Sequence, residues 1–384
     1  MNITGDQTYI KGMNKNLVLN IIRSKAPLSR ADLSQLTGLN KGTVSSLVGE
    51  LIIENFVYEI GPGESSGGRK PVLLMFKQQA AYAIGLDIGV NYLFGALTDL
   101  TGEIIETIHL PSSNRSEEIS TKVQEVINQL TVKTPSSPYG IIGIGIGFPG
   151  LVNESGTVLF APNLSGDFSN LKEQLEENYN LPVYIENEAN CGAYGEKIKG
   201  RGIDTRDLLY ISVGGGIGAG VIINNQVFKG SQGYSGEAGH AAMEFKGLPC
   251  TCGNQGCWEL YASEQAVLRK SKEKFGETLT FEELIVKAEE RNEDAVLIFK
   301  EIGEYLGHGI TNLVNIFNPE LVVIGNRMAS ARQWLEESLN NTVNSTAISF
   351  HRENLRVEFS NLNATGTAVG ASYFIIEDFF ERII

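Results

Sequence analysis

Residues 209–228 read LYISVGGGIGAGVIINNQVF, and this stretch decides the fold of the larger part of the chain. The apolar run at 209–213 predicts a buried strand, the glycines after it predict a tight turn, and residues 219–228 predict a β-hairpin. The same order occurs earlier, where residues 83–88 predict a strand before a glycine turn and residues 93–108 predict a hairpin. Two copies of this unit indicate two related α/β halves with a cleft between them.

The N-terminal region of the chain has a different pattern, which predicts three helices joined by short turns. Apolar residues at helical spacing predict a first helix over residues 14–24. Ser29 is the expected N-cap of a short second helix, and Asp32 is placed for a reciprocal capping contact. Gly38 suits the left-handed turn that follows, and Asn40 is the expected N-cap of a third helix. This order is typical of a helix-turn-helix.

Short polar and cationic side chains follow one face at the start of the third helix. These residues are Lys41, Thr43, Ser45 and Ser46. Such side chains suit base edges and phosphates in a major groove. After the helix, residues 56–60 and 71–76 predict a hairpin wing with Arg69 and Lys70 near its tip. These six residues are the candidate DNA contacts.

Charge distinguishes this end from the rest of the chain. Residues 1–80 contain nine Lys/Arg and six Asp/Glu, a net charge of +3. The whole chain carries −14, so residues 81–384 carry −17. An acidic body repels phosphate, and basic charge kept at one end is typical of a protein that binds DNA there. The alternative is a three-helix packing module that binds no DNA; charge, capping and the order of elements together favour DNA binding.

Composition limits the remaining classes. The chain has 384 residues, enough for two or three domains with sizeable cores. The sequence has no basic start followed by an apolar stretch and no apolar run long enough to span a bilayer, so we expect a cytoplasmic protein with no membrane partner. Three of the four cysteines fall within eight residues, which in a reducing compartment favours metal binding over disulfides.

The cysteine cluster follows a histidine. His240, Cys250, Cys252 and Cys257 offer one imidazole and three thiolates, a closed tetrahedral set of the kind that Zn²⁺ favours. The alternative is three free cysteines in a loop beside a hydrogen-bonded histidine. The tight cluster within reach of a histidine favours the metal. Cys191, outside the cluster, is expected to be a small core residue.

The most specific motif is GEAGH at residues 236–240, followed by CTCGNQGCWE at residues 250–259. On this motif the chain resembles the ROK family of repressors, open reading frames and sugar kinases over nearly its whole length, and within it the bacterial xylose repressors most of all. The resemblance implies an α/β fold in which an N-terminal winged helix-turn-helix precedes a duplicated actin-like, ribonuclease H-like sugar-kinase fold. It also implies that the cysteine cluster holds a structural zinc ion.

The resemblance further implies three domains and a sugar pocket. Residues 1–80 form the DNA-binding domain, residues 81–187 with 364–384 form the first α/β domain, and residues 188–363 form the second, with the zinc site and a dimerisation surface. In the pocket, amides, carboxylates and an imidazole bind sugar hydroxyls. The pocket residues are Asn163, Asn187, Glu188, Glu237, His240 and Glu259. Apart from this motif, a solvated surface is the usual place of each glutamate.

The nucleotide motifs depart from the kinase pattern. The kinases carry an aspartate base in Asn-Asp-x-Asn, where this chain has Glu188, which is longer by one methylene. The first phosphate loop has Val90 where a glycine is expected, and its threonine and lysine are absent. Gly215 stands where a threonine is usual, and residues 325–327 replace a glycine pair that faces adenosine. We therefore expect no enzymatic activity and no bound ATP.

Together these features favour a sugar-responsive transcriptional repressor of xylose-utilisation genes, which D-xylose releases from operator DNA. The expected form is a homodimer that reads an inverted repeat. Xylose is glucose without the CH₂OH arm, so Glu188 would fill the space of that arm and glucose should be only a weak competitor. Two alternatives stay open: an active sugar kinase with a regulatory DNA-binding extension, and a sensor that responds to a protein partner.

Overall fold

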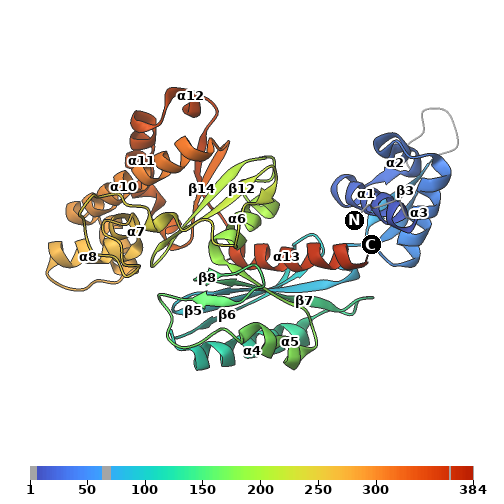
Figure 1. Cartoon of the computed structure of the whole chain (residues 1–384), viewed down its shortest axis with the longest axis horizontal. Coiled ribbons are helices and arrows are strands. Elements are labelled where there is room, and N and C mark those ends of the chain that lie inside the picture. The colour runs from blue at the N-terminus through green and yellow to red at the C-terminus, as the bar shows by residue number, and fades with distance from the viewer. Residues whose placement is uncertain (1–6, 63–70, 363–364, 384) are drawn as a thin grey trace.

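The computed structural model describes residues 7–62, 71–362 and 365–383, and these form an N-terminal region and two lobes (Figure 1). Within these residues the N-terminal region has three helices and an antiparallel sheet of order β1-β3-β2. Its elements are α1 (Gln7–Lys25), β1 (Leu28–Ser29), α2 (Arg30–Thr37), α3 (Lys41–Ile53), β2 (Val57–Pro62) and β3 (Val72–Phe76).

Local capping signals place the helix ends of this region as expected. The Ser29 hydroxyl accepts a hydrogen bond from the backbone N–H of Asp32 at 3.2 Å, and the Asp32 carboxylate accepts one from the N–H of Ser29 at 2.8 Å. Gly38 is left-handed with a φ of 72°, and Asn40 caps α3 through its side chain. However, α1 starts seven residues before the expected start at residue 14. The sequence pattern misses these residues because the first turns of the helix expose their apolar side chains and have no buried periodic face.

The first lobe is built on a five-stranded sheet of order β10-β7-β4-β5-β6. Strands β4, β5 and β6 are antiparallel neighbours, and β7 and β10 add in parallel. Helices α4 and α5 lie on one face and α13 on the other (Figure 1). The elements are η1 (Gln78–Ala80), β4 (Tyr82–Ile88), β5 (Tyr92–Asp99), β6 (Ile104–Pro111), α4 (Ser116–Lys133), β7 (Ile141–Phe148), β8 (Leu151–Val152), β9 (Val158–Phe160), α5 (Leu171–Tyr179), β10 (Val183–Asn187) and α13 (Thr365–Ile383). Strands β8 and β9 pair as a separate small hairpin.

The second lobe repeats this topology with the order β13-β12-β11-β14-β15. Again three antiparallel neighbours are followed by two strands that add in parallel. The elements are α6 (Glu188–Lys199), β11 (Leu208–Val213), β12 (Ile217–Ile223), β13 (Gln226–Val227), η2 (Ala238–His240), α7 (Glu259–Ala262), α8 (Glu264–Phe275), α9 (Phe281–Glu289), α10 (Glu293–Phe317), β14 (Leu321–Gly325), η3 (Arg327–Ala331), α11 (Arg332–Thr346), α12 (Ser349–Arg352) and β15 (Arg356–Phe359). The repeat confirms the α/β class that the duplicated pattern predicts.

Helices α6 and α13 form the layer between the two sheets. They approach so closely that a Cβ atom at Gly370 of α13 would lie 1.8 Å from the carbonyl oxygen of Cys191 in α6, so only glycine fits there. Cys191 is buried, as expected. Beyond the lobes, α13 continues to the N-terminal region (Figure 1). There, Phe379 and Phe380 of α13 share a buried core with the helices of the N-terminal region. One helix therefore connects the cleft between the lobes with the N-terminal end.

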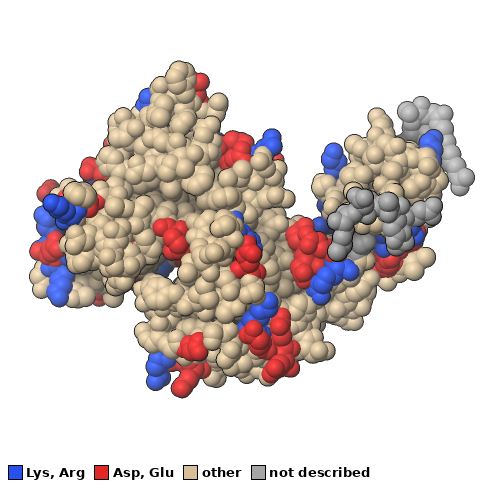
Figure 2. Space-filling view, viewed as in Figure 1, with Lys and Arg blue, Asp and Glu red and all other residues tan. Residues whose placement is uncertain are grey.

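On the face shown in Figure 2, acidic and basic side chains are interspersed over the lobes and occur side by side where the N-terminal region meets them. One ion pair at that junction joins Arg23 of α1 to Glu377 of α13 at 2.8 Å. Among the described residues, no helix combines the length and apolarity that a membrane-spanning segment needs.

Candidate functional site

The six residues expected to bind a sugar line a single cavity of about 470 Å³ between the lobes. The fold brings them from the loop after β9, the end of β10, the start of α6, the η2 turn and the start of α7. They are Asn163, Asn187, Glu188, Glu237, His240 and Glu259. Their convergence gives the cavity a set of amide, carboxylate and imidazole groups suited to hydroxyls, and their contact with a sugar stays a prediction.

Asn187 is held by the turn from β10 into α6. Its side-chain oxygen accepts hydrogen bonds from the backbone N–H groups of Ala189 at 2.8 Å and Asn190 at 3.4 Å, as an N-cap does. Its amide nitrogen donates to the carbonyl oxygen of Gly150 at 3.0 Å. One N–H of the amide is left for a ligand, so the cavity contains a donor whose direction is set in advance.

Glu188 lies where the sugar cavity meets a narrower cavity of about 230 Å³. Its Oε1 accepts a hydrogen bond from the Ser212 hydroxyl at 3.0 Å, and that hydroxyl oxygen accepts one from the Asn326 amide at 3.0 Å. Burial raises the pKa of Glu188; the Ser212 hydrogen bond lowers it, and the Glu237 carboxylate raises it further. The longer side chain thus places a fixed carboxyl group at the end of the sugar cavity.

The four candidate zinc ligands lie close enough for one ion. All four donor atoms of His240, Cys250, Cys252 and Cys257 are within 4.8 Å of one another. The Cys252 and Cys257 sulfurs are 3.7 Å apart, and Cys250 Sγ is 3.7 Å from His240 Nδ1. Sulfurs in a tetrahedral shell with zinc–sulfur bonds of about 2.3 Å lie about 3.8 Å apart. The cluster therefore fits a zinc ion, and the proposal of such an ion is taken up below.

His240 belongs to the metal cluster and to the wall of the sugar cavity. Its Nδ1 faces Cys250, whereas its Nε2 lies 3.9 Å from Glu237 Oε2. On the same wall, Glu259 Oε1 lies 3.4 Å from Cys250 Sγ. A change in the ligand geometry would therefore alter the positions of two groups that line the cavity.

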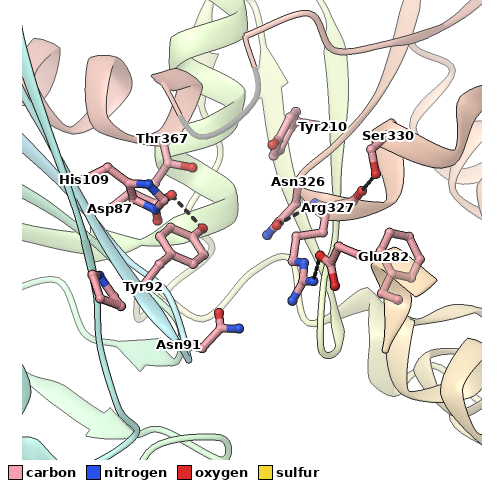
Figure 3. A pocket seen from close by; sticks show the side chains of 12 residues that line it. Asp87, Asn91, Tyr92, His109, Tyr210, Glu282, Asn326, Arg327, Ser330 and Thr367 are labelled. Carbon is pink, nitrogen blue, oxygen red and sulfur yellow. Dashed lines mark hydrogen bonds and ion pairs between the residues drawn. The ribbon is translucent and has the colours of Figure 1, made fainter. Parts of the chain in front are cut away.

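A further cavity of about 490 Å³ is lined by the altered nucleotide motifs (Figure 3). On one side of it the Tyr92 hydroxyl donates a hydrogen bond to Asp87 Oδ2 at 2.9 Å, and the Tyr92 ring packs on Gly89. Asp87 is buried and its Oδ1 has no hydrogen-bond partner among the described residues. Burial and then the Glu188 charge raise the pKa of Asp87 well above its usual range. Tyr92 thus covers the turn where a phosphate would approach.

Arg327 lies on the opposite side of this cavity (Figure 3). It forms ion pairs with Glu264 at 3.1 Å and with Glu282, and its guanidinium lies 5.7 Å from the centre of the Phe281 ring. Two carboxylates thus pair with its single positive charge. The position that faces adenosine in the kinase pattern therefore carries a long side chain, which other residues hold at the wall of this cavity.

The expected DNA contacts on α3 lie away from the core of the N-terminal region. They are Lys41, Ser45 and Ser46, which are exposed, and Thr43, which is half-buried. The opposite side of α3, including Val44 and Leu47, is buried. Arg69 and Lys70, expected at the tip of the wing, lie outside the described residues.

Apolar residues of the sugar cavity were not among the sequence-based candidates. Leu151 of β8 and Phe160 of β9 line it, and Phe160 is 57% exposed. The two strands span only two and three residues, so periodicity gives no signal for them. An exposed phenylalanine beside a set of polar groups suits the C–H face of a sugar ring.

A family model, a curated protein and solved structures are similar to this chain in sequence or in fold. The sequence model of the ROK family matches residues 83–378. The chain is 42% identical over 381 residues to the xylose repressor of Bacillus subtilis strain 168, with 98% of each chain covered. It is also similar to the crystal structure of a ROK family transcriptional regulator, a homologue of the Escherichia coli MLC protein: the TM-score is 0.83 at 27% identity, covering 97% of this chain and 98% of that one.

A kinase of known structure matches a smaller share of this chain. The ROK family glucokinase from Streptomyces griseus, in complex with glucose and AMPPNP, has a TM-score of 0.69 at 28% identity. The match covers 98% of the glucokinase but only 76% of this chain, whereas the regulator covers 97% of it. Because the family model spans most of the chain and a repressor is similar to it over nearly its full length, this chain belongs to the ROK family.

Proposed function

We propose that this protein is a transcriptional repressor of xylose-utilisation genes that leaves its operator when D-xylose binds between the lobes. The observation that carries the proposal is the contrast between the two ligand regions. The sugar cavity keeps all six polar groups suited to hydroxyls, whereas at the altered nucleotide motifs, beside a cavity of similar volume, Tyr92 is bonded to Asp87 and Arg327 is paired with Glu264. The similarity to xylose repressors over the whole chain supports the same function.

The N-terminal region is proposed to be a winged helix-turn-helix, residues 1–80, that reads operator DNA. In this proposal α3 enters the major groove with Lys41, Thr43, Ser45 and Ser46, and Arg69 and Lys70 contact the DNA from the wing. A homodimer would present two copies of α3 to an inverted repeat. The exposure of the α3 residues and the basic charge of residues 1–80 support this role.

The proposed ligand is a pentose because Glu188 closes the end of the sugar cavity. Glu188 stands at the boundary with the narrower cavity, where Ser212 holds its carboxyl group. A hexose ring carries a CH₂OH arm that must extend beyond the ring, whereas xylopyranose has none. A side chain that fills the space of this arm disfavours glucose by about 1–3 kcal/mol, so glucose binds as a weak competitor.

Zinc is proposed as a structural ion held by His240, Cys250, Cys252 and Cys257. When bound, it would fix the loop that carries these residues and orient the His240 ring. With Nδ1 on the ion, the neutral imidazole would then donate its Nε2–H to a sugar hydroxyl. In this proposal the metal supports sugar binding and supplies no chemistry of its own.

A kinase with a DNA-binding extension is the competing function. Asp87, buried at the end of β4, and the glycine-rich turn after β11 are the features that favour it. Against it, Asp87 is engaged by Tyr92, and Arg327 is paired with two glutamates at the place of the glycine pair. We propose that the protein has no ATP-dependent activity.

One set of assays separates these functions. A gel-shift titration uses the promoter fragment upstream of the xylose-utilisation genes of its own genome, with and without D-xylose or glucose. A coupled ADP-release assay with the same sugars is run in parallel. The proposal expects a shifted complex that xylose releases and no ADP release. Sugar-dependent ADP release at a steady rate would instead support the kinase.

A lysine substitution tests the DNA-binding surface. Lys41→Ala should weaken the shifted complex by about tenfold, because one charged contact to DNA is lost, and should leave xylose binding unchanged. Lys133→Ala is the control: this exposed lysine of α4 pairs with Glu106 in the first lobe, and the substitution makes the same change in charge. Equal operator affinity of the two variants would contradict the proposed orientation of α3.

A further inference from the structure

An ion pair joins the two lobes next to the turn that carries Asn187 and Glu188. Lys229, two residues after β13 in the second lobe, lies 2.6 Å from Glu186 Oε2 in β10 of the first lobe. The Glu186 side chain is only 6% exposed and that of Lys229 is 28% exposed. Although burial alone would lower it, the Glu186 carboxylate raises the pKa of Lys229, so the lysine is charged. Removing one partner of a charged pair in such surroundings lowers the free energy of unfolding, because the other charge stays buried without a partner.

The other oxygen of Glu186 holds the turn that carries the sugar residues. Glu186 Oε1 accepts hydrogen bonds from the backbone N–H of Asn187 at 2.9 Å and from the Asn190 side chain at 3.1 Å. This turn sets the positions of Asn187 and Glu188, which line the cavity. Glu186 therefore connects the sugar-binding turn of one lobe to a lysine of the other.

Lys229 also contacts the long C-terminal helix. Its ammonium nitrogen lies 5.2 Å from the centre of the Phe374 ring of α13 and 5.1 Å from that of Tyr184, and its Nζ donates to the Tyr184 hydroxyl. The Phe374 and Tyr184 rings are stacked at 5.1 Å. Lys229 is thus held at the hydroxyl edge of Tyr184 and beside the Phe374 ring, and both contacts are sensitive to small displacements of either lobe.

The N-terminal helix α1 contacts the same helix close to Phe374. Arg23 of α1 donates to Glu377 at 2.8 Å and to the Tyr373 hydroxyl at 3.1 Å, and its guanidinium lies 4.2 Å from the centre of the Phe380 ring. Tyr373 is the immediate neighbour of Phe374. The helix residues that face Lys229 and those that face Arg23 thus lie within two turns of one continuous helix.

We propose that Lys229 is a positioning residue that couples the sugar cavity to the DNA-binding end, acting through Glu186 on one side and through Phe374 of α13 on the other. The inference rests on the proposed function, since it names the route by which xylose acts on operator binding. Movement of the lobes around a sugar shifts Lys229 relative to β10 and α13, and α13 carries this shift to Arg23. Such coupling needs a ligand that distinguishes two lobe positions, which a cleft between lobes provides.

The test uses the full chain and compares the operator dissociation constant with and without saturating D-xylose, on the promoter fragment named above. In Lys229→Met the ratio of the two constants should fall by about tenfold relative to the unsubstituted protein. Lys229→Arg keeps the charge and the aromatic contacts and should restore most of the ratio. A residue that only stabilises the fold would change the melting temperature and leave this ratio unchanged.

A matched control is available within the second lobe. Lys270 pairs with Glu301 at 2.7 Å and lies 6.0 Å from the Tyr305 ring, so it has the same chemistry without joining the lobes. Lys270→Met should keep the full ratio. Adding Glu186→Gln to Lys229→Met should reduce the ratio no further, because the two residues act through each other. If Lys229→Met kept the same ratio of operator dissociation constants as the unsubstituted protein, the inference would be overturned.

A second measurement is independent of xylose. Amide hydrogen exchange of the ligand-free protein should be faster in the C-terminal half of α13 and in α1 for Lys229→Met than for Lys270→Met. If the unsubstituted protein showed no response of operator binding to xylose, the proposed function would fail, and the exchange data would still decide on the coupling. Unchanged exchange in both segments would overturn it.

Discussion

Replacing Glu188 with Asp perturbs the end wall of the sugar cavity by a single methylene. The carboxyl group retracts by about 1.5 Å, the length of one carbon–carbon bond. Its hydrogen bond from Ser212, now 3.0 Å, then lengthens to about 4.5 Å and is lost. Space opens at the junction with the narrower cavity, where the CH₂OH arm of a hexose would lie. The substitution therefore has two effects, which act differently on the two sugars.

The magnitude follows from separating these effects. Loss of the Ser212 bond weakens the support of the carboxyl group by about 1 kcal/mol, and this applies to both sugars. The room for a CH₂OH arm benefits glucose alone and is worth about 1–3 kcal/mol. In the ratio of the xylose and glucose dissociation constants the common effect cancels. The preference for xylose should therefore shrink by about tenfold to a hundredfold.

Calorimetric titration of both sugars into each protein measures this ratio. Ser212→Ala is the matched control, because it removes the hydrogen bond without shortening the Glu188 side chain, and it should leave the ratio unchanged. Glu188→Asp should release no ADP in the coupled assay, since Val90 and Gly215 still alter the phosphate loops. An unchanged preference in Glu188→Asp, or glucose bound as tightly as xylose by the unsubstituted protein, would refute the steric argument.

The remaining predictions concern the metal, the apolar wall and the buried aspartate. Cys252→Ser should lose its zinc and raise the xylose dissociation constant about tenfold through His240, as elemental analysis and calorimetry would show; full zinc content contradicts the ligand set. Phe160→Ala should weaken xylose binding about fivefold, whereas Leu159→Ala, exposed on the same strand but outside the cavity lining, should not; equal affinities contradict the stacking role. Asp87→Asn should stabilise the fold at neutral pH. Because burial raises the pKa of Asp87 well above its usual range, its charge costs stability as pH rises above about 4, so the gain should vanish below that pH. Denaturation curves at several pH values check this, and a gain independent of pH contradicts it.

Local signals explain why much of the fold could be predicted from the sequence. Some features depend only on residues that are neighbours in the sequence, so a short segment is enough to predict them. They include the capping box of Ser29 and Asp32, the left-handed Gly38 and the two glycine turns. The cluster of three cysteines indicates a metal for the same reason, because two of the cysteines are separated by one residue. The six sugar candidates came from a family motif and not from local rules.

What could not be predicted depends on exposure, short length or long separation. The first turns of α1 expose their apolar residues, and the β8–β9 hairpin is too short to show a period. The contact of Arg23 with Glu377 joins residues 354 positions apart, and the Lys229–Glu186 pair joins two lobes. These contacts follow only from the packing of α13 between the sheets, which no short segment encodes. The roles of Arg69 and Lys70 stay predictions.

The most direct test of a sugar-controlled repressor is the reverse titration. If xylose weakens operator binding by some factor, then operator DNA must weaken xylose binding by the same factor, because the two ligands are linked through one protein. Calorimetry of xylose into the free protein and into its complex with the promoter fragment measures that factor. The account predicts that xylose binds the complex more weakly, by the factor found in the gel shift; equal xylose affinity with and without DNA would contradict it.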